Sequence, residues 1–279
     1  REFSTEDLSL LTVMANVAAI RIEHARLAEV EQAERVMARD MEQAALIQRG
    51  LLPEAPPSIA GFDLAGHNVS CRTVGGDYYD FLAYPDGSVA IIIADVAGKG
   101  MPAALLMSSL QARVQVILEA PGDLAGRVAK LNRSVSSNIP GNRFITFFAG
   151  VLDPRAGTLT YCNAGHNPPL VVRRGGEVEK LEEGGMILGI LPLSTYRESA
   201  CRLEEGDVVV FYSDGVSEAA VPDSDDDFGE ERLAALIAAN RNRPAAEIVA
   251  EVMDAVSAFT AGNPAADDMT VVVLRRISH

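Results

Sequence analysis

The chain is predicted to fold as an α+β protein in which helices and strands form separate layers. Its helical stretches come in pairs bracketed by pairs of short apolar strands, which differs from the strand–helix alternation of a parallel sheet. The composition is that of a globular chain, since 48% of the residues are hydrophobic and 23% are charged. A length of 279 residues suffices for one large domain with an appendage.

The appendage is residues 4–49, which contain no proline and no glycine. Ser4 is a suitable N-cap, acidic residues follow it, and Gly50 ends the stretch, so we expect one long helix or two stacked helices. A heptad seam predicts a coiled coil, and its apolar members are Ile20, Leu27, Val30, Met37, Met41 and Ala44. A helix that packs on its own domain is the alternative, because polar residues interrupt the seam at Glu23, Glu34 and Gln48.

The proline-rich residues 50–60 are predicted to form a linker, which leaves residues 61–279 as the main domain. Short apolar runs bounded by turns predict strands in this domain over residues 62–72, 88–96, 144–152, 158–163, 170–173, 197–203, 207–213 and 269–276. Prolines and a good N-cap aspartate mark helix starts. Helices are predicted over residues 102–118, 124–137, 230–239 and 245–261.

Asp95 ends a continuous apolar run that starts at Ile91. Such a run is typical of a strand buried on both faces, so this carboxylate is expected where a buried strand gives way to a turn. An unpaired buried charge is costly. The partner of Asp95 is therefore expected to be a metal ion, an arginine or a helix N-terminus.

Three further segments, residues 75–80, 212–215 and 267–270, place aspartates in turns or at the ends of strand-like runs. Such residues can converge at one edge of a β-structure although they are far apart in sequence. Carboxylate oxygens are the ligands that Mg²⁺ and Mn²⁺ prefer, and neighbouring glycines let the backbone approach an ion closely. Asp86-Gly87, by contrast, is predicted to be a simple hairpin turn.

These segments resemble the metal-binding motifs of type 2C, metal-dependent protein serine/threonine phosphatases, and more closely the bacterial SpoIIE/RsbU branch. The resemblance covers about residues 46–276, with motifs in the right order and spacing. The matching motifs are GGDYYDF at 75–81, ADVAGKGMPAALLMS at 94–108, RFITFFAGVLD at 143–153, NAGHNPPL at 163–170, FYSDGVSEA at 211–219, FGEERL at 228–233 and DDMTVVVLR at 267–275. Ala97 departs from the small polar residue usual in the branch, at a position that is not a ligand. The resemblance implies an αββα sandwich of two antiparallel sheets flanked by helices.

The resemblance also implies a site for two Mn²⁺ or Mg²⁺ ions. Asp95 would bridge them, and the carbonyl of Val96 and the carboxylate of Asp77 would serve one ion. Asp214 and Asp267 would hold the other. A water bridging the two ions would attack the phosphorus of phosphoserine or phosphothreonine, so no side-chain nucleophile is needed.

Other polar residues near these motifs receive weaker assignments. Asp268 is expected to contact the metal ligands without binding an ion itself, and Asp267 is preferred as the ligand. Arg72 is a candidate for contact with the substrate phosphate, and a plain surface arginine on a strand is the alternative. Lys99 could steer an anionic substrate, although its surroundings do not match a Walker phosphate loop. His166 is expected to be structural, since an all-oxygen site needs no imidazole.

Charge and cysteine content exclude several functions. A net charge of −15 has the wrong sign for nucleic acid or an anionic membrane, so neither is expected as a partner. Three scattered cysteines predict no disulfide framework, and none has the downstream arginine of a tyrosine-phosphatase loop. Together with the absence of a signal-peptide pattern, this favours a cytoplasmic location.

The N-terminal helix resembles the last helix of a GAF sensor domain over residues 7–27, followed by a signalling linker. In the resembled branch the two helices after the central aspartate strand act as a switch. We hypothesise that residues 20–48 form a parallel homodimeric coil that controls these switch helices. The resemblance implies a phosphorylated STAS-type anti-sigma-factor antagonist as substrate. Two alternatives remain: a non-catalytic partner-binding module of the same fold, and a metal phosphodiesterase acting on small nucleotides.

Overall fold

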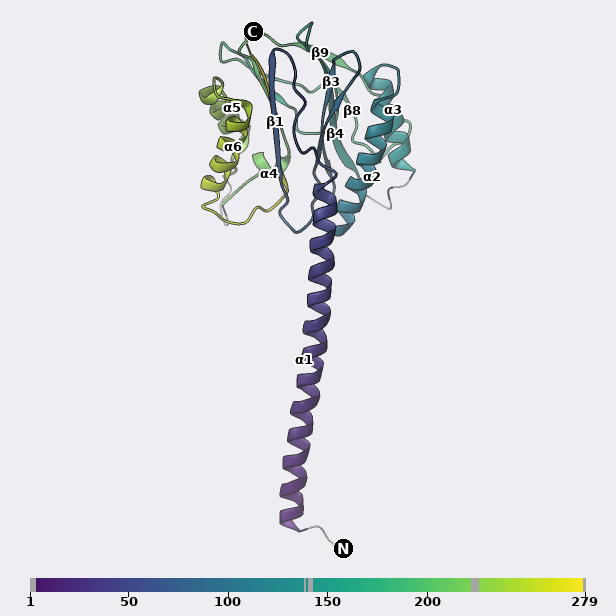
Figure 1. Ribbon diagram of the computed structural model, residues 1–279, viewed down its shortest axis with the longest axis vertical. Coiled ribbons are helices and arrows are strands. Elements are labelled where there is room, and N and C mark those ends of the chain that lie inside the picture. Colours follow the sequence, from purple (N-terminus) through teal and green to yellow (C-terminus); the bar gives the residue numbers. More distant parts are fainter. Residues whose placement is uncertain (1–3, 138, 140–142, 222–225, 278–279) are drawn as a thin grey trace. The chain divides into compact units, whose positions relative to one another are not determined.

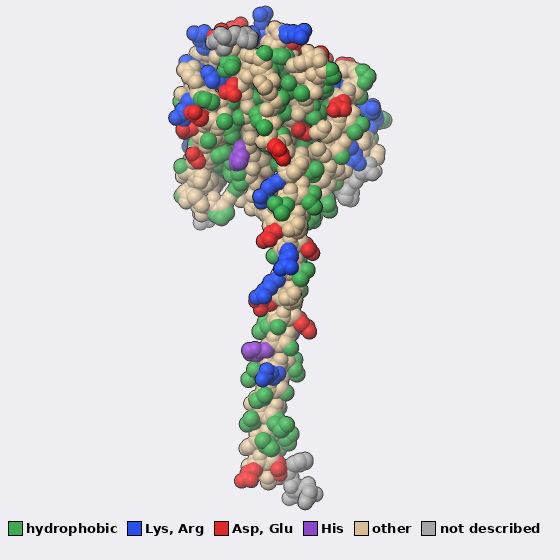
Figure 2. Space-filling model, in the orientation of Figure 1, with side chains coloured by type: hydrophobic (Ala, Val, Ile, Leu, Met, Phe, Trp, Pro, Cys, Tyr) green, Lys and Arg blue, Asp and Glu red, His purple; other side chains and the backbone are tan. Residues whose placement is uncertain are grey.

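The computed structural model describes residues 4–137, 139, 143–221 and 226–277, and it divides the chain into two compact units, residues 1–47 and 48–279. Most of the first unit is helix α1, Thr5–Arg49, a single helix instead of two stacked ones. Its start is capped as expected, because Ser4 Oγ accepts from the amide of Asp7 at 3.2 Å while Asp7 accepts from Ser4. Most large apolar side chains of α1 are exposed, and Figure 2 shows hydrophobic side chains along its N-terminal part.

The second unit is an αββα sandwich, as predicted (Figure 1). One sheet has the order β1-β11-β10-β6-β7, with bounds Phe62–Val69, Met269–Arg276, Val208–Tyr212, Leu170–Val172 and Val178–Lys180. The other has the order β2-β3-β4-β5-β8, with β9 also paired to β5. Its bounds are Tyr78–Ala83, Val89–Val96, Ile145–Asp153, Thr158–Ala164, Gly184–Gly185 and Ser199–Arg202.

Helices cover the outer face of each sheet (Figure 1). Helices α2, Met101–Leu118, and α3, Leu124–Ser136, pack on the six-stranded sheet, and α5, Gly229–Asn240, and α6, Ala245–Phe259, pack on the five-stranded sheet. The short helix α4, Asp214–Ser217, follows β10 directly. Asp123 caps α3 by accepting from the amide of Gly126 at 2.9 Å.

Strand β3 is buried on both faces, as its apolar run predicted. Ile91 and Ile93 point into the core between the two sheets, while Ile92 points into the core under α2 and α3. All three are fully buried, and burial of each such side chain contributes about 2 kcal/mol. Asp95 is thus carried to the end of a rigid central strand.

The structure corrects several sequence-based boundaries. Strand β1 ends at Val69, so Arg72 lies in a loop and not on a strand. Strand β2 was missed because its residues YYDFLA are nearly all buried and show no alternation. The sheets are antiparallel except where β8 pairs with β5 in parallel.

Within the described residues, two helices, α1 and α2, are long and apolar enough to cross a membrane by length and composition alone. Helix α2 is apolar because seven of its residues are buried in the protein core. A core helix of a soluble domain meets the same criteria, so this finding is weak evidence for a membrane span.

Candidate metal centre

Four aspartates at or next to the ends of four different strands meet at one edge of the sandwich. Asp77 directly precedes β2, and Asp95 is the penultimate residue of β3, both in the six-stranded sheet. Asp214 follows the end of β10 and Asp267 lies just before β11, both in the five-stranded sheet. The carboxyls interact, since Asp77 hydrogen-bonds Asp95 and the charges of Asp214 and Asp267 act on Asp95. The structure therefore brings the predicted cluster together from both sheets.

Glycines allow these segments to approach so closely. A Cβ atom on Gly76 would lie 2.9 Å from the carbonyl oxygen of Val96 and 3.4 Å from Oδ1 of Asp95. A Cβ atom on Gly215 would lie 2.1 Å from the carbonyl oxygen of Asp268. Any larger residue would push the acidic segments apart.

Carboxyls of the cluster have perturbed pKa values. Burial is the largest cause that raises the pKa of Asp77 and of Asp95, and each carboxyl is raised further by neighbouring aspartates. The pKa of Asp214 is raised by burial and then by the charge of Asp267. Several buried carboxyls that lie side by side can all be ionised only when a positive charge lies among them. A hard divalent cation can supply that charge.

Two hydroxyls that the sequence did not single out hold the buried carboxylate of Asp77. Thr270 Oγ1 donates to Asp77 Oδ2 at 2.5 Å, and Ser213 also hydrogen-bonds this carboxylate. Ser213 Oγ in turn accepts from the amide of Thr270 at 2.9 Å and donates to the carbonyl of Asp268 at 3.1 Å. Both residues lie within the predicted acidic segments, residues 212–215 and 267–270, which is the signal that could have identified them.

Asp268 differs from Asp267 in what its carboxylate does. Oδ1 of Asp268 accepts from the amide of Cys71 at 2.8 Å, and Oδ2 accepts from the amide of Gly76 at 2.6 Å. The side chain is buried and ties the segment before β2 to the start of β11. Asp267 is half-buried, with its side chain 37% exposed, and its Oδ2 lies 2.7 Å from Lys99 Nζ. This division of contacts favours Asp267 over Asp268 as a ligand.

Cys71 lies beside these two carboxylates, with potential ligand atoms of all three residues within 4.8 Å of one another. Burial, together with the hydrogen bond and charge of Asp268, raises the pKa of the Cys71 thiol to about 11. Burial also raises the pKa of Cys162 to about 12. Both thiols are therefore protonated at neutral pH and are poor nucleophiles.

Cationic side chains surround the turn that follows β3. A Cβ atom on Gly100 would lie 3.6 Å from Nη1 of Arg72, and one on Gly98 would lie 3.3 Å from Nη1 of Arg143. Nη1 of Arg143 is buried and has no hydrogen-bond partner among the described residues. The sequence analysis identified Arg72 as a candidate but not Arg143, because nothing in the motif at 143–153 indicated a role for its arginine.

His166 is buried behind the cluster. Its Nδ1 lies 2.8 Å from Oγ1 of Thr146, and Thr146 pairs with Asp95 across β3 and β4. The side chain of Asn163 accepts from the amide of His166 and donates to its carbonyl. Burial lowers the pKa of His166 to about 4, so the ring is neutral at pH 7. These contacts agree with the structural role expected for it.

Gln48 begins the second unit and holds the backbone next to Asp77. Its Nε2 donates to the carbonyl of Gly75 at 2.7 Å, and its Oε1 accepts from the amide of Gly75 at 3.0 Å. In the sequence this residue counted only as an interruption of a heptad seam. The two hydrogen bonds explain why a polar residue is used there.

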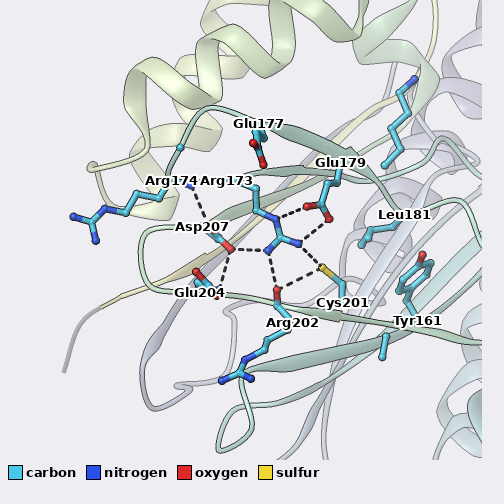
Figure 3. Close-up of a pocket in the computed structure, with 13 residues that line it drawn as sticks. Tyr161, Arg173, Arg174, Glu177, Glu179, Leu181, Cys201, Arg202, Glu204 and Asp207 are labelled. Carbon is cyan, nitrogen blue, oxygen red and sulfur yellow. Dashed lines mark hydrogen bonds and ion pairs between the residues drawn. The ribbon is translucent and has the colours of Figure 1, made fainter.

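A polar pocket of about 620 Å³ lies at the other end of β10, beside Asp207 (Figure 3). Arg173 crosses it, with Nη1 2.7 Å from both Oδ2 of Asp207 and the carbonyl oxygen of Arg202. The Nε and Nη2 atoms of Arg173 donate to the carboxylate of Glu179. The guanidinium is thus occupied in joining the two sheets and is not available to an anionic ligand.

Comparisons with known proteins identify the family of this chain. The family described as Stage II sporulation protein E (SpoIIE) matches residues 85–277. The phosphoserine phosphatase RsbU of Bacillus subtilis is 32% identical over 269 residues, which are 96% of this chain and 78% of that protein. Protein IcfG of Synechocystis is 27% identical, but the match covers 85% of this chain and only 41% of that protein.

The chain belongs to the SpoIIE family. It is therefore a PP2C-like phosphatase domain, and solved structures support the fold. The SiaA-PP2C domain of Pseudomonas aeruginosa has a TM-score of 0.77 at 22% identity, covering 87% of this chain and 98% of that one. The RsbU and RsbW domains of Rv1364c from Mycobacterium tuberculosis have a TM-score of 0.70 at 26% identity, covering 81% and 63% respectively.

Proposed function

We propose that this SpoIIE-family chain hydrolyses phosphoserine or phosphothreonine on a regulatory protein with the help of two Mn²⁺ or Mg²⁺ ions. The observation that carries the proposal is the convergence of Asp77, Asp95, Asp214 and Asp267 from both sheets. The donor set consists of oxygens, and burial raises the pKa values of Asp77, Asp95 and Asp214, which a divalent cation would counteract.

Each ligand candidate has a specific role in this proposal. Asp95 would lie between the two ions, and Asp77 and the carbonyl of Val96 would hold one of them. Asp214 and Asp267 would hold the other. Bound ions of this kind lower the pKa of water toward ~7 and offset charge on phosphoryl oxygens.

The remaining residues position the ligands and the substrate. Thr270 fixes the orientation of Asp77, and Asp268 anchors the backbone at Gly76. Arg72 is exposed beside the turn after β3, where its guanidinium can bind a phosphate oxygen. Neutral, buried His166 neither abstracts nor donates the proton of the leaving serine in this scheme.

The N-terminal helix and the substrate class complete the proposal. We infer that residues 1–49 comprise the last helix of a GAF-like sensor domain and a coiled-coil linker that forms a homodimer. Residues 50–60 link them to the phosphatase domain at residues 61–279. A STAS-type protein is the proposed substrate, supported by the similarity to RsbU and to a protein that carries both RsbU and RsbW domains. A cytoplasmic location fits this role.

A direct assay tests the catalytic part. The wild-type chain is incubated with Mn²⁺ and p-nitrophenyl phosphate, with and without EDTA, beside Asp95→Asn. Asp86→Asn is the matched control, because it makes the same substitution at an aspartate that is exposed in a hairpin turn. We expect hydrolysis only by wild type and the control, and only with metal. Activity that survives both EDTA and Asp95→Asn would refute the metal mechanism, and inactivity on a phosphoprotein as well would favour a partner-binding module.

A further inference from the structure

A second pocket, of about 240 Å³, adjoins the metal centre on the side of the five-stranded sheet. Two of its lining residues, Lys99 and Asp267, belong to the metal centre, and Gly215 follows the candidate ligand Asp214. The pocket is thus continuous with the place where the phosphoryl group would react. Neither the four-aspartate cluster nor the proposed mechanism uses it.

The walls of the pocket are firmly held. Helix α4 lies against the Asp267–Asp268 backbone, where Gly215 leaves no room for a Cβ atom. The opposite wall is the loop after α6, in which Asn263 Nδ2 donates to the carbonyl of Thr260 at 2.7 Å. Ala261 in this loop is the one non-glycine residue with a positive φ, 52°, in the part of the chain that the structure describes. This left-handed conformation ends α6 directly after its C-cap, Thr260.

The chemistry of the lining selects for an apolar group. The buried residues Ala219 and Val256, together with Met269, present hydrocarbon to the pocket. The charges along it are those of Glu218 and Asp267 against the single positive charge of Lys99, so an acidic group is repelled. The volume is below the roughly 300–1,000 Å³ of sites for whole small-molecule ligands, and it suits one side chain.

We propose that this pocket is a specificity subsite that binds an aliphatic side chain next to the phosphorylated residue of the substrate. The inference rests on the proposed phosphatase function, because the phosphorylated residue itself must reach the aspartate cluster. Lys99 stands between the two places, with Nζ 2.5 Å from the carbonyl oxygen of Ala266 and 2.7 Å from Asp267. A peptide segment that passes Lys99 can occupy both.

Phosphoserine peptides that vary only at the residues flanking phosphoserine test the subsite. Wild type with Mn²⁺ is expected to prefer leucine over glycine or aspartate at one flanking position by about tenfold in kcat/KM. Ala265→Phe fills the pocket from the loop, and Ala220→Phe fills it from the α4 side. Both variants are expected to lose the preference. Hydrolysis of p-nitrophenyl phosphate, which has no flanking residue, normalises each variant for its folded, metal-loaded fraction.

The matched control is Ala239→Phe, at an exposed position of α5 that does not line this pocket. It is expected to keep the wild-type preference. Equal rates on all peptides, or an unchanged preference in both filled variants, would overturn the subsite while leaving the proposed phosphatase function intact. If wild type hydrolyses neither the peptides nor p-nitrophenyl phosphate, the proposed function fails and the subsite with it.

Discussion

Lys99 Nζ lies 2.7 Å from Oδ2 of Asp267, so a side chain of this protein occupies a carboxylate that a metal ion is proposed to use. Gly98 and Gly100 flank Lys99, and both have positive φ values, 108° and 74°. These glycines give the turn a conformation that lets the lysine reach across from β3 to the loop before β11. Burial raises the pKa of Asp214, and the positive charge of Lys99 offsets part of this rise.

We predict that Lys99→Gln binds Mn²⁺ more tightly than wild type. Removal of the ammonium frees Asp267 and leaves the acidic cluster without this internal counter-charge. The ion pair is partly exposed, with both side chains 37% accessible, so the gain is limited to about fivefold in Kd. Calorimetric titration with Mn²⁺ measures it, and Lys180→Gln, whose lysine pairs with Glu230, is the control. Weaker binding by Lys99→Gln would show that the lysine supports the metal instead.

The stability of the metal-free protein is predicted to depend on Asp95. Burial raises the pKa of this carboxyl from 3.8 to about 7, so the folded state holds a proton that the unfolded state releases. The stabilising effect is complete below pH 4 and is lost as the pH rises toward 7, by at most about 1.4 kcal/mol per pH unit. Asp95→Asn removes this loss.

Urea unfolding in EDTA, from pH 4 to 8, checks this prediction. The free energy of unfolding of Asp95→Asn is expected to rise relative to wild type up to about pH 7 and then to stay level. Asp86→Asn is expected to show no such rise, because hydrogen bonds from Ser88 lower the pKa of Asp86. A constant difference between Asp95→Asn and wild type at all pH values would contradict the buried-charge argument.

Arg72 is predicted to act on the phosphate and not on the metal. Arg72→Ala should lower kcat/KM for p-nitrophenyl phosphate about tenfold, since a charge-assisted hydrogen bond to phosphate is worth about 1.5–3 kcal/mol. The Mn²⁺ concentration for half-maximal activity should not change. Arg155→Ala, at an exposed arginine in the turn between β4 and β5, is the control. If Arg72→Ala instead changed the Mn²⁺ concentration for half-maximal activity and left KM unchanged, Arg72 would act on metal binding and not on the phosphate.

The N-terminal helix is predicted to form a homodimer through its heptad seam. Leu27 and Val30 lie on the seam and are about half exposed, so a partner helix can cover them. Leu27→Glu with Val30→Glu should convert a dimer into a monomer in sedimentation velocity. Val36→Glu is the matched control, because Val36 is equally apolar and exposed but lies off the seam. Equal masses for wild type and the double variant would remove the coil from the proposal.

Much of this molecule could be predicted from its sequence because strong local signals agreed with the tertiary fold. The apolar run before Asp95 identified a doubly buried strand, and the absence of proline and glycine identified α1. Strand β2 was missed, since Tyr78–Ala83 is buried on both faces without a long aliphatic run. The sequence pattern showed Gln48 only as a polar interruption of the heptad seam. Its hydrogen-bond partner Gly75 is 27 residues away, so no local pattern reveals their contact.

Thr270 illustrates a role that only the structure reveals, and it yields the last prediction. Its hydroxyl donates to Asp77 at 2.5 Å from a fully buried position on β11. Thr270→Val keeps the shape but leaves Asp77 without this donor. Groups that orient a metal ligand typically contribute 10–100-fold to metal affinity, so about a tenfold increase in the Mn²⁺ concentration for half-maximal activity is expected. Thr270→Ser retains the hydroxyl and should restore most of the affinity, whereas a serine variant as weak as valine would mean that packing at Thr270, and not its hydrogen bond, determines metal binding.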